Sequence, residues 1–257
     1  MLKLYATASL KASEKLRGGI IYLLPDIALR VISLVTLLYL WRTLFASGAG
    51  QEIDLSLSQM MSYTLLSEIL YDLLVIATPA SQWLYEGLFL SLYQRPLGVL
   101  SQLLALTIGG WIPNLLLFSL PLALSAPLWP IRILPVSWLF LPSLLLCMMV
   151  GFAIDLLFAC LIIRMQRISW VVTVIRGAVV AIFSGALIPF AALPYGIGNW
   201  LQFSPFGALA GAPLAIAIGS PIPWQLILSQ LLWCVILWPL LYLFYNASRE
   251  EMMSYGG

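Results

Sequence analysis

The sequence contains no histidine, and only 9% of its 257 residues are charged. Without histidine, the chain lacks the side chain that most often acts as a general base or metal ligand near neutral pH. Its three cysteines lie in apolar runs without a CxxC or cysteine–histidine pattern, so they indicate buried small side chains. There is neither a GxxxxGK[ST] nucleotide-binding motif nor a basic tract for nucleic acid. We therefore expect no catalytic, cofactor-binding or metal site in this chain, and no nucleic-acid partner.

Hydrophobic residues, by contrast, make up 62% of the chain, and the mean hydropathy is +1.03. A soluble domain carries about 25% charged residues, so much of this surface must face lipid. The apolar runs do not alternate with polar residues as the strands of a membrane barrel do. The sequence therefore predicts an all-α integral membrane protein that forms a single transmembrane domain over residues 1–257.

The apolar runs predict about six transmembrane helices, because a helix of about 20 apolar residues crosses the ~30 Å hydrocarbon core. A short apolar piece at 208–218 stays unassigned. The predicted spans cover residues 20–45, 60–79, 98–123, 138–163, a segment that begins near 170, and residues 224–245.

Residues 1–19 predict an amphipathic "elbow" helix on the membrane surface rather than a cleavable signal peptide, because they lack a long apolar core and a cleavage site. On a helical projection, one face carries Lys3, Thr7, Lys11, Glu14 and Lys15. The other face carries Leu2, Tyr5, Ala12 and Leu16. An ordinary solvated helix is the alternative.

Basic residues are unevenly divided between the two sides of the predicted spans. If residue 1 is in the cytoplasm, the inner loops and ends contain Lys3, Lys11, Lys15, Arg17, Arg95, Arg164, Arg167 and Arg249. Arg132 is then the only basic residue clearly in an outer loop. The positive-inside rule thus places both termini in the cytoplasm. The absence of an organelle signal favours a prokaryotic inner membrane with several passes.

Residues 185–207 combine apolar composition with helix-breaking residues, among them Pro189, Pro194 and Pro205. Backbone without helical partners is tolerated at membrane depth only where it is buried in protein or lines a wet cavity. Counting at 1.5 Å per residue from Trp170 places the break at the outer leaflet. We expect a re-entrant helical hairpin between the fifth and sixth spans, with the three prolines in an outer gate. An extended outer loop is the alternative.

Two short motifs resemble those of the permease subunits of ABC-type exporters of the ABC-2 superfamily. The sequence EGLFLSLYQRPLGVL (86–100) is similar to the cytoplasmic connection that precedes their third span. The sequence GALIPFAALP (185–194) is similar to the run that follows their fifth span. The predicted topology, with a surface helix and both ends inside, resembles the same family over nearly the whole chain.

The resemblance implies a complex of two permease subunits, identical or related, with two separate ATPase subunits that bind ATP and Mg²⁺. This chain would then be no enzyme itself, and its other partners would be membrane lipids. Segment 80–96 is the candidate cytoplasmic coupling segment, with a plain interfacial loop as the alternative. Its expected contact residues are Trp83, Leu84, Glu86, Leu88 and Arg95, with Leu92 on the same apolar face.

Four ionisable residues lie within the predicted spans: Glu68, Asp72, Asp155 and Arg176. A charge there costs about 2.5–3.5 kcal/mol on insertion scales, so each should face the bundle interior or pair with a neighbour. Asp155 and Arg176 lie at similar depths on adjacent spans, where they can pair as a structural clamp or line a substrate path.

Two other functions remain open at this point. A secondary transporter that acts alone would be expected to contain inverted repeats, and none is evident. A membrane-embedded enzyme is the less favoured reading, with Glu68 and Asp72, one helical turn apart, as its first candidate residues. The transported substrate and the choice between identical and related permeases do not follow from the sequence.

Overall fold

Helices form all the regular secondary structure in the part of the chain that the computed structural model describes. The described residues are 2–17, 23–48, 50, 53–86, 88–126, 131–165 and 169–255. Within them, four helical stretches are long and apolar enough to cross a membrane: Leu24–Ala46, Val99–Ser125, Phe140–Arg164 and Pro223–Glu251. The expected all-α architecture with membrane-spanning segments is confirmed, whereas the expected count of six spans stays a prediction.

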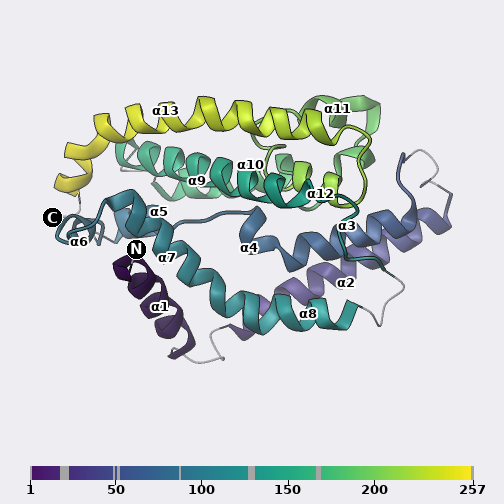
Figure 1. Cartoon of the computed structure of the whole chain (residues 1–257), viewed down its shortest axis with the longest axis horizontal. Coiled ribbons are helices and arrows are strands. Elements are labelled where there is room, and N and C mark those ends of the chain that lie inside the picture. Colours follow the sequence, from purple (N-terminus) through teal and green to yellow (C-terminus); the bar gives the residue numbers. More distant parts are fainter. Residues whose placement is uncertain are drawn as a thin grey trace.

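The centre of the bundle is the pair of helices α9 (Phe140–Arg164) and α13 (Pro223–Tyr255), which lie side by side along the long axis (Figure 1). α9 is apolar on all sides, and it is buried because other helices surround it. Small residues bring those neighbours close: a side chain at Gly151 would lie 3.0 Å from the side chain of Ile76. The core of the protein is therefore built around α9.

The predicted third span forms one continuous helical stretch beside the predicted surface helix. It comprises α7 (Val99–Asn114), a π-helical turn (Leu115–Ser119) and α8 (Leu120–Ser125). The π turn follows Pro113, which lacks the N–H that a regular helix requires.

α1 (Leu2–Arg17) crosses α7 closely: a side chain at Gly109 would collide with the backbone of Ala8. The expected N-terminal helix is thus present, and its place at the membrane surface stays a prediction. The expected apolar face is buried only in part: Ala12 is 7% exposed, whereas Tyr5 is 76% exposed and Leu16 40% exposed.

The second predicted span, residues 60–79, is not a single helix. α2 (Leu24–Ala46) packs against α3 (Leu57–Ile69), which begins with a capping box between Ser56 and Gln59. α3 ends at Ile69 and is followed by the short helix α4 (Tyr71–Leu74) and a non-helical stretch at 75–79. The β-branched residues Val75, Ile76 and Thr78 and the proline that follows them disfavour a helix at 75–79. Hydrogen bonds from other helices satisfy this non-helical backbone, as the next subsection describes.

The fifth predicted span corresponds to α10 (Ser169–Phe183), which has 15 residues and is about 22 Å long. It ends before the first proline of the broken stretch because Gly185, with φ of +77°, takes the left-handed conformation common after helix ends. The broken stretch contains two 3₁₀ turns (Phe190–Ala192 and Pro194–Gly196) and α11 (Ile197–Leu201).

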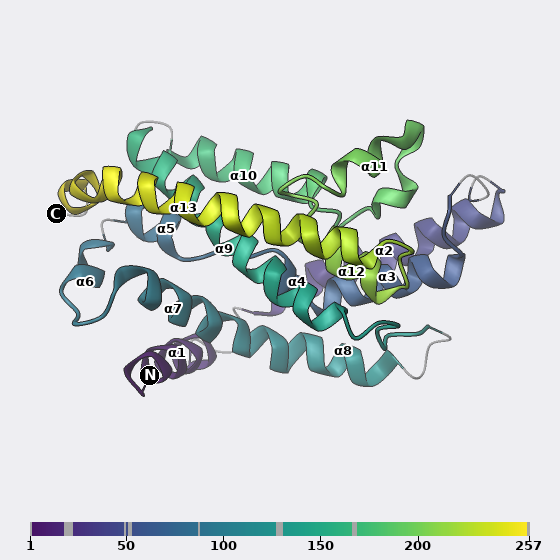
Figure 2. The ribbon, with the colours of Figure 1, turned by 45° about the horizontal axis from the view of Figure 1, so that its top comes forward.

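The two ends of the bundle carry different elements. The start of α1, the end of α13, α5 (Ala80–Tyr85) and α6 (Leu90–Tyr93) lie toward one end, at the left of Figures 1 and 2. α11, α12 (Gly211–Ala217) and the connection between α2 and α3 lie toward the other end. The previously unassigned piece at 208–218 is thus largely the short, buried helix α12.

Candidate functional site

Asp155 of α9 and Arg176 of α10 form an ion pair inside the bundle. The Nη2 atom of Arg176 lies 2.7 Å from Oδ1 of Asp155, and the two side chains are 14% and 2% exposed. The other carboxylate oxygen accepts a hydrogen bond from the backbone N–H of Thr78 at 2.8 Å, and Arg176 also donates to the carbonyl of Ile76. The pairing anticipated from helix depth is present, and it joins two helices to the non-helical stretch at 75–79.

This ion pair fixes the start of α5. The backbone N–H of Thr78 donates to Asp155. The hydroxyl oxygen of Thr78 in turn accepts a hydrogen bond from the N–H of Ala80, the first residue of α5. α5 packs against α9, which carries Asp155. Because a buried ion pair has only a few acceptable geometries, a shift of α5 must be accompanied by a shift of α9 or α10. Both expected roles of the pair remain open, since it also borders a cavity of about 440 Å³ beside Trp170 and Val174.

A second charged cluster lies between α1, α2, α4 and α7. Arg30 donates to both carboxylate oxygens of Asp72, at 3.0 and 3.1 Å, and its Nε atom lies 3.3 Å from Asp26. Asn114 donates to Asp72 at 3.1 Å and accepts from Lys15 at 3.3 Å. Asp26 and Arg30 are one helical turn apart on α2, whereas Asp72 comes from a different element and was not matched to a partner from the sequence.

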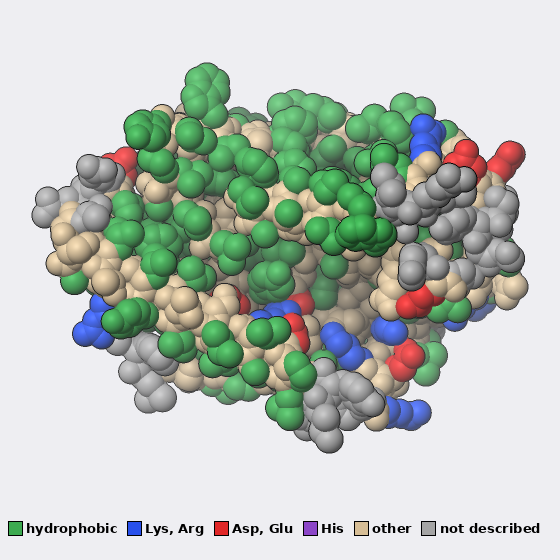
Figure 3. All heavy atoms as spheres, turned by 180° about the vertical axis from the view of Figure 1, so that it is seen from behind, with side chains coloured by type: hydrophobic (Ala, Val, Ile, Leu, Met, Phe, Trp, Pro, Cys, Tyr) green, Lys and Arg blue, Asp and Glu red, His purple; other side chains and the backbone are tan. Residues whose placement is uncertain are grey.

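Charged side chains of both signs cross the lower middle of an otherwise largely hydrophobic face (Figure 3). Lys15, on α1, is partly enclosed, and burial lowers the pKa of its ammonium group, an effect that the nearby carboxylate of Asp72 opposes. α1 is therefore anchored by polar contacts to α7 as well as by close backbone packing.

Glu68 and Asp72, one helical turn apart in the sequence, have different surroundings. Glu68 is buried, at 7% exposure, near the end of α3, and Asp72 lies beyond the helix break, held by Arg30 and Asn114. Among the described residues, no group of three or more histidine, cysteine, aspartate or glutamate side chains could hold a metal ion.

The predicted coupling segment folds as two short helices, α5 and α6, rather than as one. Leu84, like Leu92, is completely buried in the chain's own core, and Trp83 packs against that core. Most of the expected apolar face thus points inward, which removes Leu84 from any contact surface. Glu86 and Arg95 are exposed, and Leu88 is 49% exposed.

Sequence reasoning missed Gln102, which attaches this segment to α7. Its buried amide Nε2 donates to the carbonyls of Leu92 and Leu97, at 2.7 and 2.9 Å. These bonds fix the chain between α6 and α7, where the sequence QRP offers no helical partner. A glutamine inside an apolar span was the available signal, because a buried amide must find hydrogen-bond partners.

The broken stretch is held by hydroxyl groups of α3. Tyr63 donates to the carbonyl of Gly185 and Ser67 to the carbonyl of Ala186, both at 2.6 Å. The carbonyl of Ser184 accepts from the N–H of Gly211 at 2.7 Å. Neighbouring protein thus supplies the donors that a non-helical backbone needs away from water. Neither hydroxyl residue was identified from the sequence, although Tyr63 and Ser67 are one helical turn apart.

The three prolines lie at separate turns of this stretch. Pro189 precedes the first 3₁₀ turn, Pro194 begins the second, and Pro205 lies in the turn after α11. Tyr195, between the last two, has a positive φ of 59°. No continuous helix joins α10 to Trp200, as the sequence predicted, whereas the position of this stretch at the outer leaflet stays a prediction.

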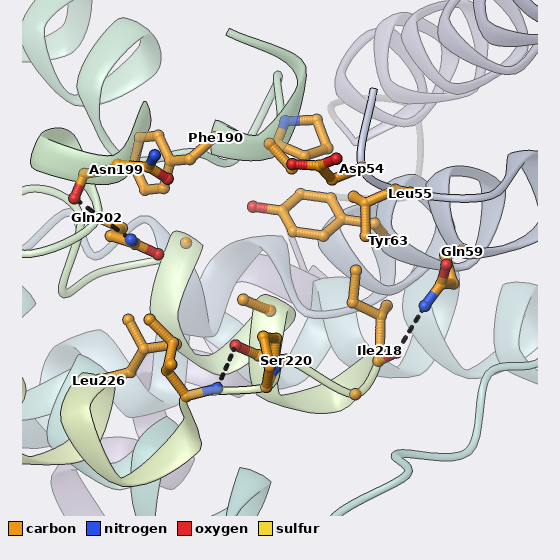
Figure 4. Close-up of a pocket in the computed structure, with 17 residues that line it drawn as sticks. Asp54, Leu55, Gln59, Tyr63, Phe190, Asn199, Gln202, Ile218, Ser220 and Leu226 are labelled. Carbon is orange, nitrogen blue, oxygen red and sulfur yellow. Dashed lines mark hydrogen bonds between the residues drawn. The ribbon is translucent and has the colours of Figure 1, made fainter. Parts of the chain in front are cut away.

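A cavity of about 280 Å³ lies between α3, the broken stretch and the connection from α12 to α13 (Figure 4). Asp54 and Tyr63 stand on one side of it, Asn199 and Gln202 on the other, and Ile218 and Leu226 lie below them. The cavity is thus bordered by the same residues that hold the helix break open.

No family model matches this sequence, and a search of curated proteins finds no significant match. The fold itself defines the class: an all-α protein in which, over the described residues, four helices are able to cross a membrane.

Proposed function

We propose that this chain is the membrane-spanning subunit of an ATP-driven exporter, forms its substrate path, and couples to a separate ATPase subunit. The observation that carries the proposal is the link between the surface segment at α5 and the bundle interior. Through Thr78, the start of α5 is hydrogen-bonded to Asp155 and thereby to Arg176 of α10. A push on α5 from outside the membrane would therefore act on both α9 and α10.

The same helix leads toward the opposite end of the molecule. α10 ends at the broken stretch, which sits across the bundle from α5 and α6 (Figure 2). A closure that must open cannot be one rigid helix, and the turns at Pro189, Pro194 and Pro205 meet this requirement. In this proposal the broken stretch is the outer gate, and ATP-driven movement reaches it through α10.

The proposed topology keeps six crossings in a prokaryotic inner membrane. In addition to the four long helices, α3 with α4 and α10 would supply the two remaining crossings. Both termini would then be cytoplasmic, at the end that carries α5 and α6. A second permease subunit, identical or related, completes the complex.

Cysteine labelling tests this topology. A cysteine in place of Trp200 should react with a membrane-impermeant maleimide in intact cells, and one in place of Arg249 should react only after permeabilisation. Trp200 is 85% exposed, and the native residues Cys147, Cys160 and Cys234 are buried, so their background should be low. Labelling at Arg249 from outside would contradict the proposed orientation.

Purification from native membranes tests the function. The protein should bring with it a polypeptide that contains a GxxxxGK[ST] motif and hydrolyses ATP. Leu88→Glu should reduce recovery of that subunit by about tenfold or more, because a charge replaces an exposed apolar contact in the coupling segment. Leu134→Glu is the matched control, since Leu134 is 76% exposed in the connection to α9.

Recovery of the protein without any ATPase would instead favour a secondary transporter that acts alone. If an ATPase is recovered and Leu88→Glu leaves its amount unchanged, the exporter proposal stands, but the contact lies elsewhere on the surface.

A further inference from the structure

We infer that the cavity beside the helix break binds an amphipathic amine, a compound with an apolar body and one protonated amino group. Asp54 is the only charged residue among the described residues that line the cavity. It lies at the mouth, above the ring of Tyr63, while Ile218 and Leu226 form part of an apolar base (Figure 4). A single carboxylate over an apolar base matches a ligand with one cationic end.

Two acceptors on the Asp54 side of the cavity are available to a ligand, those of Tyr63 and of Asp54 itself. The hydroxyl group of Tyr63 donates to Gly185, so its oxygen can only accept a further bond. Gln59 is satisfied within the protein, since its amide donates to Ile218 and accepts from Ser56. The carboxylate of Asp54 is an acceptor only, and no described residue donates to it. A protonated amine can donate both to the carboxylate of Asp54 and to the hydroxyl oxygen of Tyr63.

Size and shape limit the apolar part of the ligand. A cavity of about 280 Å³ is near the lower end of the range for small-molecule pockets. It accommodates one aromatic ring and a short chain. Anionic compounds are disfavoured by Asp54, and a neutral sugar would leave its hydroxyl groups facing the side chains of Leu55, Ile222 and Leu226.

Binding to this cavity does not require an ATPase, but its role as the cargo site rests on the proposed exporter function. The two ideas can therefore fail separately. If the amine binds but no ATPase co-purifies, the binding site stands and the exporter proposal fails. If an ATPase co-purifies but the amine does not bind, the exporter proposal stands and the binding site fails.

The test uses the full chain in phosphatidylcholine nanodiscs and three compounds of equal shape: 4-phenylbutylamine, 4-phenylbutanol and 4-phenylbutanoate. Saturation-transfer NMR, with empty nanodiscs subtracted, measures each affinity. We expect the amine to bind at least about fivefold more tightly than the alcohol, and the acid to bind least. Asp54→Asn should abolish that preference, whereas Glu250→Gln, an exposed acid at the far end of α13, should leave it unchanged.

A second variant tests the location. Ala215 lines the cavity, and Ala215→Phe would fill it, so all three compounds should lose their specific binding. Equal affinities of the amine and the alcohol for the parent protein would overturn the inference, as would an amine preference that survives Asp54→Asn. Adding phosphatidylethanolamine to the nanodiscs separates two sources of the ammonium group. If phosphatidylethanolamine competes with 4-phenylbutylamine, a lipid headgroup can occupy the site. If it does not compete, the site selects a free amine. Either outcome supports the site.

Discussion

Replacing Arg176 with methionine is expected to destabilise the folded protein by about 3–5 kcal/mol, because the change leaves the buried carboxylate of Asp155 without its cation. The backbone carbonyl of Ile76 loses its donor at the same time. Thermal unfolding in detergent, followed by fluorescence-detected size exclusion, measures the loss. Arg132→Met is the matched control: Arg132 is exposed, and its replacement should change stability by no more than about 0.5 kcal/mol.

The double variant Asp155→Asn with Arg176→Met shows whether the loss comes from the unpaired charge. It removes both charges but keeps an acceptor for the N–H of Thr78. We expect it to recover more than half of the stability, because a buried pair replaced as a whole costs far less than a pair broken on one side. If Arg176→Met were as stable as the parent, the pair could not be the element that holds α5 to the bundle.

The double change Tyr63→Phe with Ser67→Ala is expected to reduce stability by about 2–4 kcal/mol and to loosen the broken stretch. Each change removes a donor from a buried carbonyl, of Gly185 or Ala186, and an unmet buried acceptor costs about 1–3 kcal/mol. Hydrogen exchange should then accelerate over residues 184–211 and stay unchanged in α2.

Ser62→Ala serves as its control. The hydroxyl of Ser62 donates to the carbonyl of Ser58 within the same helix, so its loss frees no acceptor of the broken stretch. Protected amides over 184–211 in the double variant would mean that packing alone holds the break, without the hydroxyl groups of α3.

The sequence allowed much of the helical layout to be predicted. The spans expected at 98–123, 138–163 and 224–245 each correspond to a helical stretch that begins and ends within a few residues of the predicted limits, apart from the extension of α13 beyond residue 245. Such helices depend on long apolar runs, a local property. The pairing of Asp155 with Arg176 was also accessible, because depth in a helix is a count of residues.

Other features depended on partners that are distant in sequence. Asp72 is tied to Arg30, 42 positions away, and the carbonyl of Gly185 to Tyr63, 122 positions away. The sequence does not indicate the partner of either residue, because a carboxylate or a hydroxyl group can form a hydrogen bond with any suitable group that packing brings near. The role of Gln102 was not predicted for the same reason: its side chain donates to two backbone carbonyls, and these have no sequence signature.

By itself, the sequence determined that this chain is helical and suited to a membrane, since low charge and long apolar runs make any other arrangement costly. Only the tertiary structure decided that the chain also leaves the helix at 75–79, and which way the side chains of its helices point. At 75–79 the backbone leaves the helix where Asp155 and Arg176 satisfy its N–H and carbonyl groups, and Leu84 faces inward because α9 packs beside α5. A helix can end inside apolar sequence only when other parts of the fold supply those partners.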